Sequence, residues 1–194
     1  MTEATPRRIT WRRLDHPALE TAILEHEPND DAWILLGNVS GTLPDDRRYD
    51  LRYHVRCDAG WVTRDALVEG MLGRDEVYVT IERDSDDEWR RDGALVQEVV
   101  GCVDVDLGFS PITNTLPIRR LDLAVGASAT VRAAWLRFPE LELEVLEQVY
   151  RRVSKDQYAY ESGGGRFRAD LTVDASGLVR RYGEYWVAQD EAPE

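Results

Sequence analysis

The feature that most constrains this chain is a strict alternation of apolar and polar side chains in short runs separated by turns. It is clearest from Tyr49 to Cys57, where Tyr, Leu, Tyr, Val and Cys alternate with Asp, Arg, His and Arg. Successive side chains of a strand point to opposite faces, so the run predicts a strand with one buried face. The turn at 58–60 follows it, and residues 61–71 are expected to return antiparallel.

Similar runs recur at hairpin spacing along the whole chain. Further strands are predicted at 9–14, 19–27, 32–43, 75–83, 88–91, 121–125, 129–138, 158–162, 167–173, 178–182 and 185–188. Residues 141–154 also fit one or two helical turns, but their neighbours and their β-branched and aromatic side chains favour a strand. The prediction is an all-β fold, an antiparallel meander curled into an open barrel or β-roll with little helix.

No composition shift or linker divides the chain. Its 194 residues, 43% of them hydrophobic, suffice for one large core. We expect a single domain over residues 9–188, with flexible termini at 1–8 and 189–194. No apolar run reaches 18 residues, so no stable membrane insertion is expected. The opening residues MTEATPRRITWRR lack the apolar region of a secretory signal, which favours a cytoplasmic protein.

The charge balance is strongly acidic and almost free of lysine. The chain carries 37 acidic and 24 basic residues, a net charge of −13, and Lys155 is its one lysine. Such a surface suits a salt-rich cytoplasm, where mobile ions screen self-repulsion. We therefore expect a salt-adapted protein. The same charge argues against nucleic-acid binding, which needs a basic face.

One stretch, residues 101–121 (GCVDVDLGFSPITNTLPIRRL), does not repeat the strand pattern. It begins with a short strand that carries Asp104 and Asp106 on one side, roughly 6.5 to 7 Å apart, and continues through a compact turn at 113–115. Two carboxylates at that spacing can share the acid and base roles of glycoside hydrolysis. The favoured alternative is that they pair with Arg119 and Arg120 and fix the irregular backbone.

Other chemistry is not indicated. The sequence has no glycine-rich phosphate loop and no GxSxG motif. Its three histidines lack metal-ligand spacing, so neither a metal nor a cofactor is expected. Cys57 and Cys102 are predicted to be buried free thiols. The six tryptophans and eight tyrosines favour an aromatic core, with a concave aromatic face for a lipid chain or a sugar as the alternative.

Four segments together resemble a bacterial and archaeal family described as "putative glycolipid-binding": YHVRCDAGWVTR, GCVDVDLGFSPITNTLPIRRL, AAWLRFPELELEVLEQVY and FRADLTVDASGLVRRY. The resemblance runs from about Trp11 to Trp186. It implies an open roll similar to lipoprotein carriers, which shelter acyl chains in a concave sheet. It also implies ligand-binding roles for Arg64, Asp104, Asp106, Thr113, Asn114, Arg119, Arg120, Gln148 and Tyr150.

Three hypotheses about function follow. The favoured one is a binding protein that holds a small amphiphile, a glycolipid or a fatty acyl chain, in a concave sheet, with Arg64, Asn114 and Arg119 at its polar head. A structural module without a ligand is the second. The third is a hydrolase acting on a sugar or lactone, for which Asp104 and Asp106 are the catalytic candidates. An enzyme is thus disfavoured, and no catalytic residue is assigned.

Overall fold

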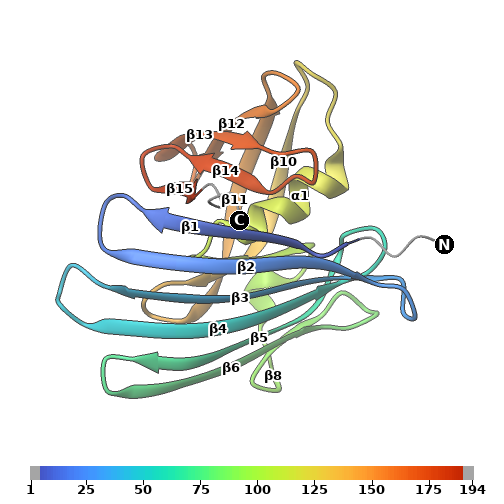
Figure 1. Cartoon of the computed structure of the whole chain (residues 1–194). Coiled ribbons are helices and arrows are strands. Elements are labelled where there is room, and N and C mark those ends of the chain that lie inside the picture. Colours follow the sequence, from blue (N-terminus) through green and yellow to red (C-terminus); the bar gives the residue numbers. More distant parts are fainter. Residues whose placement is uncertain (1–4, 190–194) are drawn as a thin grey trace.

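The computed structural model describes residues 5–189, which form one 15-stranded sheet. The order across the sheet is β8-β7-β6-β5-β4-β3-β2-β1-β15-β14-β13-β12-β11-β10-β9. The sheet is curled but not closed (Figure 1). Its neighbouring strands are antiparallel except for β9 and β10, which run parallel. The all-β prediction is confirmed, with this one parallel pair as a departure from the meander.

The N-terminal half is a long meander, blue to green in Figure 1. Its strands are β1 (Arg7–Arg13), β2 (Ala18–Glu27), β3 (Ala32–Thr42), β4 (Arg48–Cys57), β5 (Thr63–Leu72), β6 (Asp75–Arg83), β7 (Trp89–Arg91) and β8 (Ala94–Leu95). The alternation seen in the sequence sets its inner face: in β4, Tyr49, Leu51 and Val55 are at most 2% exposed. Asp50, Arg52 and His54, which alternate with the buried residues, lie on the opposite face.

The C-terminal half is a second group of strands, orange to red in Figure 1. They are β10 (Ser128–Arg137), β11 (Glu142–Arg152), β12 (Gln157–Ser162), β13 (Phe167–Val173), β14 (Val179–Tyr182) and β15 (Trp186–Gln189). The ambiguous segment 141–154 contains strand β11, as favoured over a helix. Strand β1 pairs with both β2 and β15 and so joins the two halves.

The irregular segment lies between the halves and fills the concave side of the N-terminal meander. It contains β9 (Asp104–Leu107), η2 (Ile112–Asn114) and α1 (Thr115–Leu121), and the short helix η1 (Gln97–Val99) precedes it. Phe109, Ile112 and Leu116 are fully buried in the same core cluster as the inner faces of β1 to β6. These side chains occupy the concave side of the N-terminal meander. The open concave face expected from the sequence is therefore largely filled by the chain's own residues.

Two polar contacts hold the irregular segment against the meander. The backbone N–H of Val105 donates to Thr63 Oγ1 at 3.0 Å, and the Thr63 N–H donates to the Val103 carbonyl at 3.3 Å. Strand β9, the last in the sheet order, therefore lies close to β5. This contact curls the sheet back on itself.

The predicted strand at 121–125 is wrong. Helix α1 ends at Leu121, Asp122 adopts a left-handed conformation with φ 39°, and residues 122–125 form no strand. The compact turn expected at 113–115 is where η2 passes into α1. Pro117 is compatible with this helix because a proline in the first turn gives up no intrahelical hydrogen bond. The alternation in LDLAV covers only Leu121, Asp122 and Leu123, which is too short to distinguish a strand from a loop.

The flexible termini expected at 1–8 and 189–194 lie mostly outside the described residues, and β1 already begins at Arg7. Within the described part of the chain, no helix has the length and apolar character needed to span a membrane. Cys57 and Cys102 are buried free cysteines, as predicted.

Candidate functional site

A cavity of about 210 Å³ lies between the irregular segment and the C-terminal strands. We call it the ring cavity because aromatic side chains form much of its wall. Polar groups enter it mainly from the irregular segment. Its lining is Arg13, Asp106, Leu107, Gly108, Ser110, Asn114, Trp135, Leu146, Tyr160, Ser162, Phe167, Tyr182, Tyr185 and Trp186.

The aromatic wall is built by neighbouring strands of the C-terminal half. Tyr160 on β12, Phe167 on β13 and Tyr182 on β14 contact one another with ring centroids 5.8 to 6.0 Å apart. Tyr185 packs against Phe167 at 5.3 Å. These edge-to-face and tilted contacts are the favoured geometry for rings. They hold one another in place and present apolar surface to the cavity.

Asp106 is the carboxyl group of the ring cavity. Its Oδ2 accepts a hydrogen bond from Gln148 Nε2 at 2.5 Å, and its Oδ1 accepts one from Thr113 Oγ1 at 3.3 Å. Thr113 Oγ1 in turn accepts the N–H of Leu107 at 3.2 Å. Strand β9, the turn η2 and strand β11 thus meet at a single carboxyl group.

The same network extends to a second pair of predicted residues. The Tyr150 hydroxyl donates to Asn114 Oδ1 at 2.8 Å and lies 3.3 Å from Gln148 Oε1. Asn114 Nδ2 donates to the Pro111 carbonyl at 3.1 Å. The predicted residues Asp106, Thr113, Asn114, Gln148 and Tyr150 therefore form one hydrogen-bonded group, and two of them, Asp106 and Asn114, reach the ring cavity.

The pKa of Asp106 is raised to about 6. Loss of hydration is the main cause, since protein atoms surround the carboxyl group except where it reaches the cavity. Hydrogen bonds from Gln148 and Thr113 act in the opposite direction, and the charge of Asp104 adds to the rise. Near neutral pH both protonation states of Asp106 are accessible. The carboxylate accepts hydrogen bonds from a ligand, and the protonated form can donate one.

Asp104 has a different environment from Asp106. Its two oxygens accept hydrogen bonds from Arg120 Nε at 3.1 Å and Arg120 Nη2 at 2.5 Å. Burial raises the pKa of Asp104, and the guanidinium opposes that rise. The pair is a bidentate bridge between β9 and α1, a geometry that fixes irregular backbone. Asp104 does not line the ring cavity.

A buried carboxyl group that the sequence did not single out, Glu20 on β2, lies next to this region. Its Oε1 accepts hydrogen bonds from Tyr53 Oη and Ser110 Oγ, each at 2.5 Å. Its Oε2 is buried without a partner among the described residues. Burial raises the pKa of Glu20 to about 8, against the lowering effect of these two donors and of Arg13.

Gly37 makes the contact of Tyr53 with Glu20 possible. A Cβ atom at Gly37 would lie 2.2 Å from the Tyr53 ring, so only glycine leaves room for it. Glycines inside strands commonly mark a bulge or a close approach. Gly37 and Gly41 mark close approaches, because the pairing of β2 with β3 is regular through both residues.

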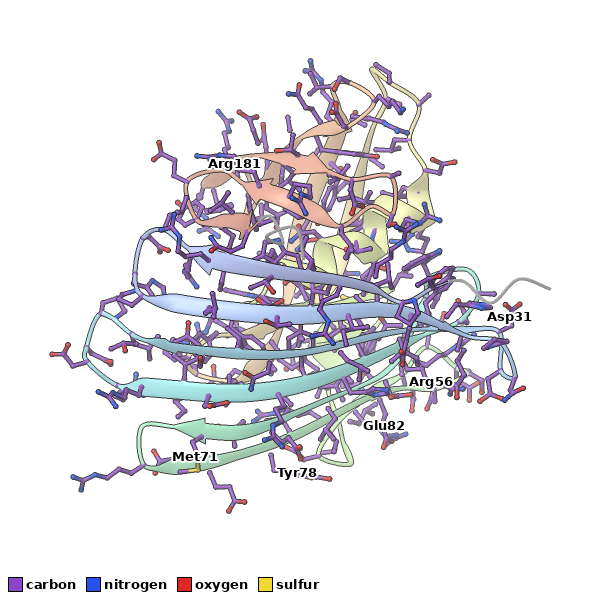
Figure 2. The ribbon with its side chains drawn as sticks, in the orientation of Figure 1. Asp31, Arg56, Met71, Tyr78, Glu82 and Arg181 are labelled. Carbon is purple, nitrogen blue, oxygen red and sulfur yellow. The ribbon has the colours of Figure 1, made fainter. Side chains whose placement is uncertain are left out.

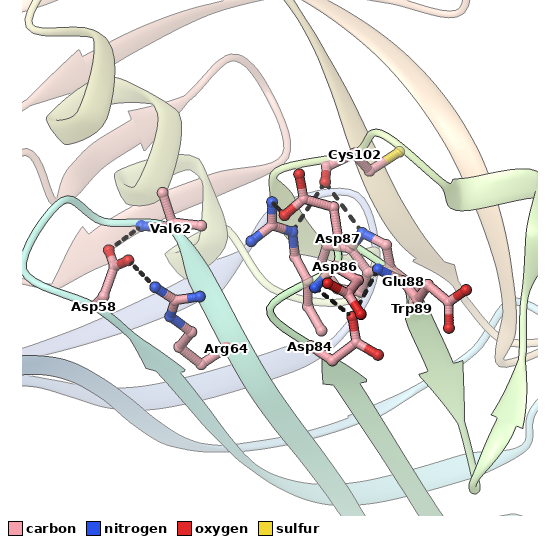
Figure 3. Close-up of polar contacts among 10 residues, drawn as sticks. Asp58, Val62, Arg64, Asp84, Asp86, Asp87, Glu88, Trp89 and Cys102 are labelled. Atoms are coloured by element: carbon pink, nitrogen blue, oxygen red, sulfur yellow. Dashed lines mark hydrogen bonds and ion pairs between the residues drawn. The ribbon is translucent and has the colours of Figure 1, made fainter.

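Two predicted site residues lie away from the ring cavity. Arg64 on β5 is exposed and pairs with Asp58, Nη2 to Oδ2 at 2.6 Å (Figure 3). Arg119 on α1 projects toward the loop after β4, and its guanidinium carbon lies 5.2 Å from the centre of the Trp61 ring. The residues predicted to bind ligand therefore fall into three places: the network around Asp106, the Asp104–Arg120 bridge, and these two arginines.

Sequence patterns did not identify Arg13, Glu20 or Ser110 as site residues, nor which rings form the aromatic wall. One signal was available for Glu20, because it shares a strand face with Ala22 and Leu24, which are buried. The tyrosines of the wall carried no such signal, since strand tyrosines occur equally in a solid core. Among the described residues, no group of three or more His, Cys, Asp or Glu side chains is arranged to hold a metal ion.

Comparisons with known proteins agree with this architecture. The family model described as "Putative glycolipid-binding" matches residues 8–188. The crystal structure of a DUF1089 family protein from Pseudomonas aeruginosa superposes with a TM-score of 0.75 at 34% sequence identity, covering 85% of this chain and 88% of that chain. Comparison with curated proteins found no match.

Proposed function

Because this chain belongs to the family described as "Putative glycolipid-binding", we propose that it binds a sugar-bearing amphiphile with the sugar ring in the ring cavity. The observation that carries the proposal is the combination of an aromatic wall with Asp106, Asn114, Ser110 and Ser162 in one small cavity. Binding pockets are typically apolar with a few convergent polar groups that fix orientation.

The chemistry of a sugar matches both sides of this cavity. A pyranose ring has faces of C–H groups, which pack on rings such as Tyr182 and Phe167. Its edge carries hydroxyl groups, which need partners that both donate and accept. Asn114 offers both roles through its amide group, and Asp106 with its raised pKa offers them near neutral pH. Ser110 offers an acceptor, because its hydroxyl proton is donated to Glu20.

The size of the ring cavity favours the headgroup over the lipid chain. Its volume of about 210 Å³ is below the roughly 300 to 1,000 Å³ of pockets that enclose drug-sized ligands. The concave side of the N-terminal meander is occupied by Phe109, Ile112 and Leu116. We therefore assign the ring cavity to one sugar unit, with the acyl chain extending outside it.

Binding is preferred to hydrolysis by a pair of aspartates. Both oxygens of Asp104 are engaged by Arg120, so Asp106 is the one member of the pair that faces the ring cavity. A paired mechanism needs both carboxyl groups at the substrate. A purely structural role does not account for polar side chains that reach an accessible cavity.

The proposal is tested by titrating the protein with octyl glucoside below its micellar concentration, using calorimetry, and by native mass spectrometry after incubation with a lipid extract. We expect saturable binding that Asp106→Ala and Phe167→Ala each weaken about tenfold, because each removes one of the two kinds of contact. The matched controls are Asp75→Ala, at the exposed start of β6, and Tyr78→Ala, whose side chain projects from the outer side of β6 (Figure 2).

Failure of octyl glucoside to bind, with no lipid retained in the mass spectrum, would count against the proposal. So would equal weakening by the site variants and by the two β6 controls. Circular dichroism and thermal melting of each variant separate loss of binding from loss of fold.

A further inference from the structure

We propose that a second cavity binds an oxyanion carried on a sugar-sized ring. This cavity has a volume of about 250 Å³ and shares no lining residue with the ring cavity. We call it the stack cavity, because its lining includes a continuous stack of side chains, His26, Trp33, Trp61 and Arg119, together with Arg7. These residues come from β1, β2, β3, the β4–β5 loop and α1.

The stack is continuous from one member to the next. The rings of His26 and Trp33 lie 4.8 Å apart, and those of Trp33 and Trp61 lie 4.5 Å apart and nearly parallel, at 17°. The guanidinium carbon of Arg119 lies 5.2 Å from the Trp61 centroid. Trp61 is 6% exposed, whereas Trp33 keeps part of its surface in solvent. An apolar ring surface and a cation are therefore presented side by side.

Arg119 is held in place by packing rather than by a carboxylate. Its side-chain stem lies against Gly177, where an added Cβ would come within 2.8 Å of Arg119 Cδ. Among the described residues it forms no ion pair, in contrast to its neighbour Arg120. A stacked guanidinium keeps its N–H groups at the edge of the plane, where they can bind two oxygens of a phosphate or carboxylate. Little side-chain entropy remains to be lost on binding.

The charge of the stack cavity differs from that of the molecule. The chain as a whole carries −13, so most of its surface repels anions. In the stack cavity Arg7 and Arg119 supply two positive charges, and Glu25 is the one carboxylate among the described lining residues. The two arginines and the exposed face of Trp33 together suit a ligand with an oxyanion next to a ring.

A phosphorylated sugar has this chemistry, either as a free metabolite or as the headgroup of a lipid. The inference does not depend on the ring cavity. Substitutions in the stack cavity are expected to leave octyl glucoside binding unchanged, and substitutions in the ring cavity are expected to leave oxyanion binding unchanged.

The test is a titration of ¹⁵N-labelled protein at low ionic strength with glucose 6-phosphate, inorganic phosphate or glucose. The indole N–H signals are assigned by Trp33→Phe and Trp61→Phe. Glucose 6-phosphate is expected to shift the signals of Trp33 and Trp61 and to leave those of the buried Trp11 and Trp89 unchanged. It should bind about tenfold more tightly than inorganic phosphate, because it adds the ring contact. Glucose alone should not shift these signals.

Two variants assign the binding to the arginines. Arg7→Gln and Arg119→Gln should each weaken glucose 6-phosphate about tenfold, and Arg74→Gln, which removes the same charge in the β5–β6 turn, should not. Arg119 packs against Trp61, so the Arg119→Gln substitution can disturb the fold. Arg7 is exposed at the start of β1, so Arg7→Gln tests the role of the positive charge even if the Arg119 variant does not fold.

Vesicles containing phosphatidylinositol distinguish the two sources of ligand. If the protein floats with these vesicles, and the Arg7 and Arg119 variants do not, the ligand is a lipid headgroup. If the protein binds glucose 6-phosphate but does not float, the ligand is a free sugar phosphate. The inference is overturned if neither ligand binds, if glucose 6-phosphate binds no more tightly than phosphate, or if Arg74→Gln weakens binding as much as Arg7→Gln.

Discussion

Glu20 has an unusual environment for a glutamate, because its carboxyl group is fully buried. Its pKa is about 8 in the folded protein against an ordinary 4.5, because burial disfavours the charged form. The folded state therefore binds a proton more tightly than the unfolded state does. The resulting stabilisation is complete below pH 4.5 and is lost as the pH rises through 8.

We expect Glu20→Gln to remove this pH dependence. Glutamine retains an oxygen that accepts from Tyr53 and Ser110, and it cannot ionise. Between pH 4.5 and 8 the unfolding free energy of the wild type should fall by on the order of 4 kcal/mol more than that of the variant. Urea unfolding across this pH range measures the difference. Glu25→Gln, on the same strand, is the control, and identical slopes for wild type and Glu20→Gln would contradict the assignment.

At the scale of elements, three hairpin loops share the same hydrogen-bond pattern. Asp58, Asp84 and Asp174 each begin a loop after a strand, and each accepts through Oδ1 the N–H groups two and four residues later at 2.8 to 3.0 Å. Figure 3 shows the first two loops. The fourth residue of each loop, Trp61, Asp87 or Gly177, has φ between 63° and 83°. An arginine follows six residues after each aspartate.

This repeat positions the residues around Arg119 in the stack cavity. The first and third loops, DAGWVTR and DASGLVR, supply Trp61 and Gly177, which enclose Arg119 from two sides. Each aspartate satisfies backbone donors that the tight turn leaves without other partners. The loops belong to different halves of the sheet, and α1 lies between them.

Replacing either aspartate should therefore destabilise the fold. We expect Asp58→Ala and Asp174→Ala each to lower the unfolding free energy by about 1–3 kcal/mol, because two backbone N–H groups lose their acceptor. Chemical denaturation provides the measurement. Asp75→Ala, at the start of β6, should change it by less than about 0.5 kcal/mol. Equal effects for all three variants would show that the loops draw no special stability from their aspartates.

At the scale of the whole molecule, charge dominates the surface. Asp31 and Glu82 project outward near the edge of the meander, and Arg56 and Arg181 are scattered among such carboxylates (Figure 2). Many of the ion pairs join exposed partners, such as Arg47 with Asp45, and contribute little individually. The net charge of −13 then opposes compaction, most strongly when few ions are present to screen it.

Salt should consequently stabilise the protein. We expect the melting temperature to rise steadily as KCl is increased from low millimolar to molar concentration, because screening relieves the self-repulsion of the folded state. Differential scanning calorimetry gives the measurement. Full stability at low salt with no gain in molar KCl would refute salt adaptation.

The sequence by itself determined most of the strands, because alternation and turn chemistry act over a few neighbouring residues, and it failed at 121–125. It also predicted the buried cysteines. Resemblance to a family named nine residues, with Asp106, Thr113, Asn114, Gln148 and Tyr150 among them. It did not show that these five are joined to one another.

Only the tertiary structure decided what the irregular segment encloses. Gln148 meets Asp106 across 42 residues of chain, and Ser110 meets Glu20 across 90. No local pattern encodes such contacts, because they depend on how far the sheet curls and on which side chains fill its interior. The same packing separated Asp104, bound to Arg120, from Asp106, which reaches the ring cavity, although the two residues share one face of a four-residue strand.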